Sequence, residues 1–342
     1  MKAYLPRVRL AMFILAALSL AACRAPAPHP CRVDKGAVPP KPAWAGPEEW
    51  AVSSLPQPGN GWISSVAVKY DGSAGVYGGS IGGSFIPISE EVTLIYFKIG
   101  PKMEDLSPVV MTLPGIALRN YAAMAWSPNG LAFGSRSTLG VSDPESGSIK
   151  RLRELEIGDQ KNLNSIPTHN AVVWAPGGDC VAATVPLEGD KGELLTWNAA
   201  GARDASARHE IDFLEKANAW TDEGVLLVWS SGATPARARW MDPATGAAKD
   251  APPPPPDAQA FSWVGGGWLT VDRIGTVMHR IPGEPATLIT SVTPALELLP
   301  NERRRWLRVL ASDNGRAVLV EESVVAPKKD LRHMHVLTPR AP

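Results

Sequence analysis

The segment AAMAWSPNGLAFGS, residues 122–135, joins two apolar runs through the polar turn Ser127-Pro128-Asn129-Gly130. The arrangement returns four times downstream and once, more weakly, upstream. The copies are SVAVKYDGSAGVYG (65–78), AVVWAPGGDCVAAT (171–184), ANAWTDEGVLLVWS (217–230), AFSWVGGGWLTVD (260–272) and RVLASDNGRAVLVE (308–321). Turn residues between runs rich in Val, Leu and Ala predict a β-hairpin in each copy.

The spacing of the copies predicts the fold class. The aligned positions are Val68, Trp126, Trp174, Trp220, Trp263 and Ala311, separated by 58, 48, 46, 43 and 48 residues. A period near 45 residues built from short strands is the length of one four-stranded propeller blade. We expect an all-β, six-bladed β-propeller. Seven blades is the alternative, because the first interval has room for extra strands.

Two of the turns carry a family resemblance. The segments WSPNG (126–130) and WAPGGD (174–179) resemble the Trp-Ser-Pro-Asp-Gly turn of TolB-like β-propellers, and the repeat pattern is similar to that of WD-repeat-like propellers. The resemblance covers residues 48–340. It implies a propeller that binds or assembles other proteins.

The last repeat lacks one strand, since only RAVLVEE and DLRHMHVLTP follow Ala311. The strand-like segment EEWAVSSLP, residues 48–56, has no blade of its own. We predict that it supplies the outer strand of the sixth blade and removes an exposed edge. Residues 205–219 fit either a short helix or an outer strand with its loop. The repeated tryptophans are expected to pack between blades.

The first residues form an export signal. Lys2, Arg7 and Arg9 precede an apolar run from Leu10 to Leu20 that is too short to span a bilayer, which needs about 20 residues. The following Leu20-Ala21-Ala22-Cys23 resembles the bacterial lipobox, in which the Cys becomes acylated. By resemblance to enterobacterial sorting, the lack of Asp after Cys23 favours the outer membrane.

These features predict three parts. Residues 1–22 form a signal peptide, residues 23–47 a lipidated Ala/Pro-rich tether carrying fatty acids such as palmitate, and residues 48–342 the propeller. The expected location is the bacterial cell envelope, anchored by lipid, on either side of the outer membrane.

Two cysteines remain once Cys23 is acylated. Cys31 lies in the tether and Cys180 in a predicted strand. An oxidising compartment would let them pair and staple the tether to the propeller. The alternative is a free Cys31 and a small buried Cys180.

Composition excludes several classes of protein. The chain has 34 Lys+Arg and 34 Asp+Glu, so its formal net charge is zero, and 44% of its residues are hydrophobic. A disordered chain is excluded, and no nucleic-acid partner is expected, because such proteins need a basic face.

One short segment is a candidate contact for a partner. Arg303, Arg304, Arg305 and Trp306 stand together in a predicted connection. Cationic residues beside an aromatic are typical of binding hot spots, here for a protein or an anionic glycan. A solvated run of charges is the alternative.

No residue pattern predicts catalysis. Ser80 lies in a G-x-S-x-G segment, but the residues after it are not helical, as a nucleophile elbow would require. His333 and His335 share one face of a strand, yet a metal site needs three or four donors. We therefore expect no catalytic residue, metal or cofactor. The predicted function is a non-catalytic scaffold whose rim loops bind another envelope protein or complex. The alternatives are a carbohydrate or peptidoglycan binder and a hydrolase or lyase with a site in the channel.

Overall fold

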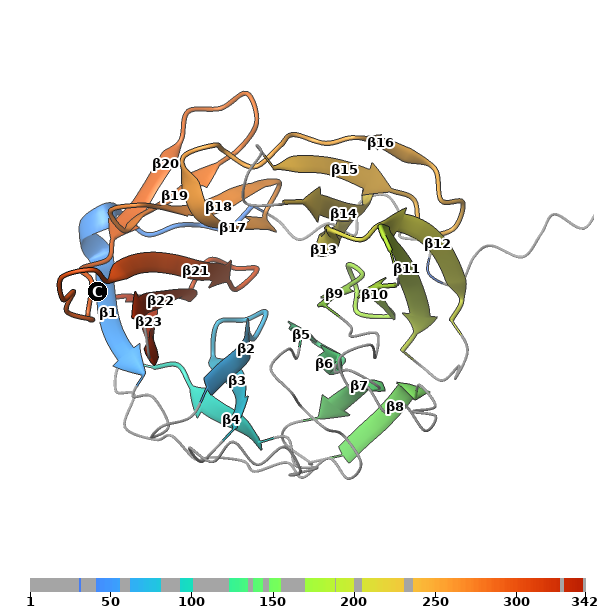
Figure 1. Ribbon diagram of the computed structural model, residues 1–342, viewed down its shortest axis with the longest axis horizontal. Helices are drawn as coiled ribbons and strands as arrows, with labels where there is room; N and C mark the ends of the chain where they lie inside the picture. The colour runs from blue at the N-terminus through green and yellow to red at the C-terminus, as the bar shows by residue number, and fades with distance from the viewer. Residues whose placement is uncertain are drawn as a thin grey trace, which may run out of the picture.

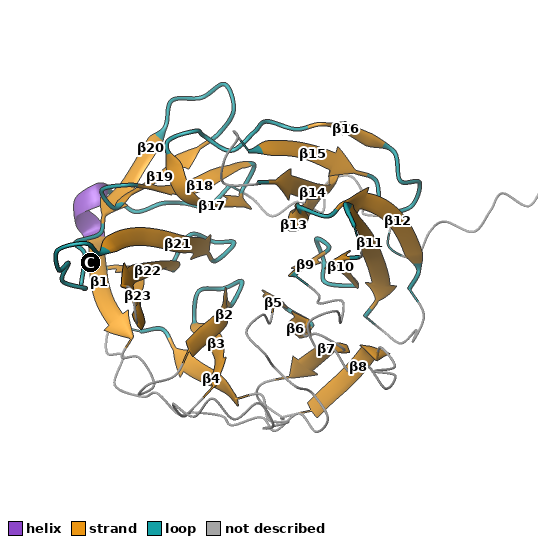
Figure 2. Ribbon diagram, in the orientation of Figure 1, coloured by secondary structure: helices purple, strands orange, loops and turns teal. Residues whose placement is uncertain are grey.

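The computed structural model describes most of the chain beyond residue 40. The described residues are 31, 41–55, 62–80, 93–100, 123–134, 138–143, 148–154, 170–187, 189–199, 205–230, 236–326 and 329–340. They form six sheets arranged as blades around a central axis, which confirms the six-bladed β-propeller (Figure 1). The only helix among them is the short 3-10 turn η1, Pro47–Glu49 (Figure 2). Within the described residues, no helix has the length and apolar character needed to cross a membrane.

The blades follow one another along the chain. Blade 1 contains β2 (Trp62–Val68), β3 (Ala74–Ser80) and β4 (Thr93–Lys98). Blade 2 contains β5 (Ala123–Ser127), β6 (Gly130–Gly134), β7 (Thr138–Asp143) and β8 (Ser148–Glu154). Blade 3 contains β9 (Ala171–Trp174), β10 (Cys180–Pro186), β11 (Lys191–Asn198) and β12 (Ala207–Asp212).

The second half of the ring repeats the plan. Blade 4 contains β13 (Glu215–Thr221), β14 (Gly224–Trp229), β15 (Arg237–Met241) and β16 (Ala248–Asp250). Blade 5 contains β17 (Ala258–Val264), β18 (Gly267–Asp272), β19 (Thr276–Arg280) and β20 (Thr287–Ser291). Blade 6 contains β21 (Arg303–Ala311), β22 (Val318–Ala326), β23 (Lys329–Pro339) and, from the other end of the chain, β1 (Trp50–Leu55). Residues 207–221 are therefore strands β12 and β13, and the helix alternative is wrong.

The ring is closed by strand β1. It pairs antiparallel with β23 from Trp50 opposite Pro339 to Leu55 opposite Met334, and Figure 1 shows the two strands side by side. The amide of Arg340 also donates to the carbonyl of Glu49 at 2.6 Å. Both ends of β1 are buried, at Trp50 and Leu55. The prediction that residues 48–56 complete the sixth blade is confirmed.

The repeated tryptophans pack against the preceding blade. The ring of Trp126 lies 5.6 Å from that of Tyr96 in blade 1, and that of Trp263 lies 5.5 Å from that of Trp240 in blade 4. Trp174 donates from Nε1 to the carbonyl of Ala125 in blade 2 at 2.9 Å. Trp220 joins a core cluster with blade 3. The tryptophans that recur every 43 to 48 residues thus pack between neighbouring blades, as predicted.

Hairpin turns also connect neighbouring blades. Asn129 donates from Nδ2 to the carbonyl of Gly178 in the next blade at 2.9 Å, and Asn314 donates to the carbonyl of Asp71 at 2.8 Å. The two asparagines occupy the same place in their repeats, three residues after Trp126 and Ala311. The second bond joins the last blade to the first.

The propeller has two distinct faces. One carries the turns between the first and second strands of the blades, at residues 69–73, 128–129, 175–179, 222–223, 265–266 and 312–317; we call it the hairpin face. The opposite face carries the chain into each inner strand, for example at residues 213–214 and 292–302, and carries the turns between second and third strands. We call it the connection face. The two ends of β21 show the separation, since Arg303 begins that strand and the hairpin follows Ala311.

We predict that removing residues 48–56 will open the ring. The deletion exposes the edge of β23 and removes the buried Trp50 and Leu55, so the melting temperature should fall by more than about 10 °C. Thermal unfolding followed by circular dichroism measures this. The control is Val52→Thr, because Val52 is exposed and threonine suits a strand. An unchanged melt for the deletion would contradict closure by β1.

Candidate functional site

The predicted contact segment forms the start of an inner strand. Residues Arg303 to Trp306 open β21, where the sequence indicates a connection. Trp306 is only 1% exposed, so it cannot contact a partner. Its indole Nε1 donates to the carbonyl of Arg273 at 3.4 Å, and its ring lies against Gly275. The expectation of a binding tryptophan is corrected: Trp306 seals the boundary between blades 5 and 6.

The arginines that precede Trp306 open onto a pocket. Its volume is about 620 Å³, and it lies on the connection face between blades 5 and 6. The lining residues are Gln259, Arg273, Leu298, Glu302, Arg303, Arg304 and Arg305. They come from the start of β17, the turn between β18 and β19, the connection 292–302 and the start of β21. We call this the arginine pocket.

Arg304 is held in place by hydrogen bonds to β22 and to the 292–302 connection. Arg304 donates from Nε to Glu322 at 2.7 Å and from its guanidinium to the carbonyl of Leu296. Glu322 is fully buried and also accepts from the amide of Ala295 at 2.8 Å. The carboxylate therefore positions both Arg304 and the connection that forms the pocket wall.

Glu322 is held in its ionised form. Burial opposes ionisation, but hydrogen bonds from His335, the Ala295 amide and Arg304 outweigh it and lower the pKa of Glu322 to about 2. Nε2 of His335 lies 3.0 Å from the carboxylate and, because an ionised carboxylate only accepts, must be the donor.

The other three arginines of the pocket have no acidic partner among the described residues. Arg273, Arg303 and Arg305 are exposed, and within the described residues none of them forms an ion pair. The pocket's own acid, Glu302, accepts from the amide of Leu299 at 2.9 Å and thereby shapes the connection. Arg273, Arg303 and Arg305 outnumber the single carboxylate of Glu302 in the lining, so the pocket has a net positive charge.

Exposed apolar side chains gather on the same face. Seven large hydrophobic residues are exposed in the described part of the chain, and five of them lie toward the connection face, four in its turns or connections and Val325 near the end of β22. These five are Phe213, Ile274, Leu298, Leu299 and Val325. Leu298 and Leu299 belong to the pocket wall or border it, and Ile274 follows Arg273. Exposed apolar side chains bordered by polar groups are typical of a protein-binding surface.

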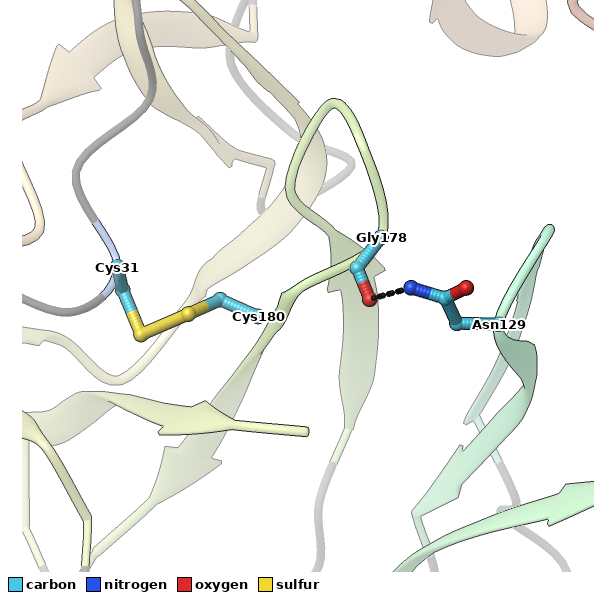
Figure 3. Close-up of a disulfide and its surroundings, with 4 residues drawn as sticks. All are labelled: Cys31, Asn129, Gly178 and Cys180. Atoms are coloured by element: carbon cyan, nitrogen blue, oxygen red, sulfur yellow. Dashed lines mark hydrogen bonds between the residues drawn. A yellow bond between two sulfur atoms is a disulfide. The ribbon is translucent and has the colours of Figure 1, made fainter. Parts of the chain in front are cut away.

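The opposite face holds the N-terminal segment. Cys31 and Cys180 are joined by a disulfide with Cα atoms 5.5 Å apart, and Figure 3 shows it beside the Asn129–Gly178 bond of the hairpin face. Farther along, Pro42 packs against the turn glycines Gly265 and Gly315. Both glycines have positive φ, and the contacts leave no room for a side chain. The segment is thus attached to blades 3, 5 and 6. Cys23, the predicted lipidation site, lies outside the described residues.

The residues considered for chemistry do not assemble a reactive centre. The rings of His333 and His335 meet edge to face with centroids 4.5 Å apart, and His335 is buried against Glu322. No group of three or more His, Cys, Asp or Glu among the described residues could hold a metal ion. Ser80 ends strand β3, and the residues that follow it are outside the described part.

Sequence reasoning missed Arg273, Leu298, Leu299 and Glu322. A signal for Glu322 was present: Glu321-Glu322 interrupts the apolar strand VLVEESVVA, and acidic residues are rarely buried without partners. The other three come from separate segments, which only the fold brings together.

Comparisons with known proteins show a similarity in fold only. No protein-family model matches the chain, and no curated protein matches it. Among solved structures, TolB from Acinetobacter baumannii aligns at 14% identity and a TM-score of 0.44, over 75% of this chain and 62% of that one. A prolyl endopeptidase aligns at 13% identity and a TM-score of 0.42, over 83% and 43%.

A third structure is the Cps50 (Swd1) β-propeller domain of Myceliophteria thermophila, at 13% identity and a TM-score of 0.43, over 85% and 90%. This chain spans less than two thirds of the length of the first two structures. Likeness this low bears on neither activity nor partners.

We predict that Glu322→Gln destabilises the protein in a pH-dependent way. The folded pKa of about 2 lies below the ordinary 4.5, so ionised Glu322 contributes fully above pH 4.5 and loses its contribution as the pH falls toward 2. From that shift, the variant should lose about 3 kcal/mol of unfolding free energy at pH 7. At pH 3 the loss should be less than half of this. Urea unfolding at both pH values measures it, with the exposed Glu48→Gln as control. A loss independent of pH would contradict the assignment.

We also predict that the disulfide contributes to stability. It links residues 149 apart, so it restricts the unfolded chain, and Cys31→Ala should cost about 2–4 kcal/mol. Dithiothreitol should lower the melting temperature of the wild type to that of the variant and leave the variant unchanged. A wild-type melting temperature that dithiothreitol does not change would refute the stabilising role of the disulfide.

Proposed function

We propose that the protein is a lipid-anchored component of the bacterial envelope and that its propeller is a non-catalytic scaffold binding another envelope protein through the connection face. The observation that carries the proposal is the difference between the two faces. The hairpin face holds the N-terminal segment through the disulfide and Pro42, whereas the connection face presents apolar side chains and the arginine pocket.

The attachment of the N-terminal segment gives the proposed anchor an orientation. Cys31 follows Cys23 by eight positions, and an extended chain of that length spans at most about 28 Å. An acylated Cys23 would therefore hold the blade 3 side of the hairpin face close to the membrane. The connection face would then point away from the lipid and be free for a partner.

The tryptophans do not favour the carbohydrate-binding alternative. Sugars stack on exposed aromatic rings, but the tryptophan side chains whose exposure the structure describes are buried or half-buried. Those at the repeat positions are engaged between blades. The large tryptophan content is thus explained by packing.

Site-specific photo-crosslinking in cells tests the scaffold function. A photoreactive residue at Leu299 or Ile274 should give an adduct with one abundant envelope protein, because both positions are exposed on the connection face. The control position is Asp222, which is exposed on the hairpin face and should give no such adduct. Equal adducts from both faces, or none at Leu299 and Ile274, would refute the proposal.

The anchor is tested separately. Cys23→Ser should abolish incorporation of labelled palmitate and release the protein from the membrane fraction. Labelled fatty acid on the variant would show that Cys23 is not the site. The crosslinking result distinguishes the scaffold from the anchor, because it depends on the propeller face alone.

A further inference from the structure

We propose that the arginine pocket binds an acidic peptide segment, a stretch of a partner protein that carries several carboxylates with an apolar residue among them. The inference rests on the proposed function and names the chemistry that the connection face would recognise. It is argued from the charges, the walls and the rigidity of the pocket.

The charges of the pocket call for an anionic ligand. Arg273 of blade 5 and Arg303 and Arg305 of blade 6 belong to the lining, and none of the three forms an ion pair with the described residues. Positive charges in the lining attract an anion that enters the pocket. A guanidinium group pairs with a carboxylate through two parallel hydrogen bonds, which suits arginine to this ligand.

The walls of the pocket favour a peptide over a small inorganic anion. A volume of about 620 Å³ lies in the range of sites that hold multi-atom ligands, and it far exceeds a single phosphate. Leu298 lines the pocket, and Leu299 and Ile274 stand exposed beside it, at 45%, 63% and 77% exposure. These side chains offer contacts to an apolar residue that a phosphate does not have.

The site is already organised without a ligand. Glu322 neutralises Arg304 and fixes it beneath the pocket, and it also holds the amide of Ala295. Farther along the 292–302 connection, the amide of Leu299 donates to the carboxylate of Glu302, next to the start of β21. A wall held at two points loses little freedom when a ligand binds, which favours affinity.

Substitution of Glu302 should change the affinity for an acidic peptide in the direction opposite to substitution of an arginine. Its carboxylate is the acid that lines the pocket, so it repels an acidic ligand. Glu302→Gln removes the charge and keeps an oxygen that can accept from Leu299. This variant should bind an acidic peptide more tightly, whereas loss of an arginine should weaken binding.

Fluorescence anisotropy with the labelled peptide Glu-Glu-Leu-Glu-Glu-Leu on the full-length protein provides the measurement. Arg305→Ala and Arg273→Ala should each weaken binding about tenfold, the usual effect of losing a hydrogen bond to a charged group. Glu302→Gln should tighten binding about threefold. The matched control is Arg208→Ala, which removes the same charge from an exposed arginine of blade 3. Circular dichroism verifies that each variant is folded.

Three outcomes would overturn the proposal. Equal weakening by Arg208→Ala and Arg305→Ala would show that overall charge attracts the peptide. Tighter binding of pyrophosphate, or of vesicles of anionic phospholipid, through the same arginines would assign the pocket to phosphate groups. Failure of the peptide to bind would refute an acidic peptide as the ligand of the pocket.

The scaffold function fails in a distinguishable way. If Leu299 still gives its adduct in an Arg303→Ala/Arg305→Ala variant at wild-type yield, the connection face binds a partner and the pocket ligand is refuted. If no adduct forms with the wild type, the scaffold itself is refuted. Loss of the adduct only in the double variant supports both.

Discussion

The structure depends on the pairing of β1 with β23. Six sheets arranged around an axis form a stable ring only if the first and last sheets contact each other. The first and last strands of the propeller, β1 and β23, lie in the same sheet and close the ring. Blade 6 solves this by combining three strands from the end of the chain with one from its beginning. The bond from Asn314 to Asp71 then joins that composite blade to blade 1. Blade 6 also supplies Arg303, Arg304 and Arg305 to the lining of the arginine pocket.

Much of the fold could be predicted from the sequence because it is built from local signals. The hairpins follow from turns such as Ser127-Pro128-Asn129-Gly130, and the packing of blades follows from tryptophans that recur at one repeat position. Closure could be predicted by counting strands, since the last repeat was short by one and residues 48–56 had no blade. The 205–219 segment stayed ambiguous, because short apolar periodicity does not separate an amphipathic helix from a strand with its loop.

The candidate site could be predicted only in part. The cluster Arg303, Arg304 and Arg305 is visible in the sequence, but the roles of its members are not. Alternation along β21 turns Trp306 inward, and Glu322 binds Arg304 across the sheet from an adjacent strand. Arg273 enters the pocket from another blade, about 30 residues earlier in the chain. Such a site depends on contacts between blades, which no local pattern of residues encodes.

The attachment of the N-terminal segment has a mechanical consequence. Strand β1 is an outer strand, and a pull on its N-terminal end would separate it from β23 one hydrogen-bonded pair at a time. The disulfide at Cys31 precedes β1 in the chain and connects to blade 3, so a force arriving from the N-terminus loads a covalent bond first. The load then passes into the body of the propeller along β10 and bypasses the seam between β1 and β23. A propeller held through this disulfide can bear a pulling force from its N-terminal side without separation of β1 from β23.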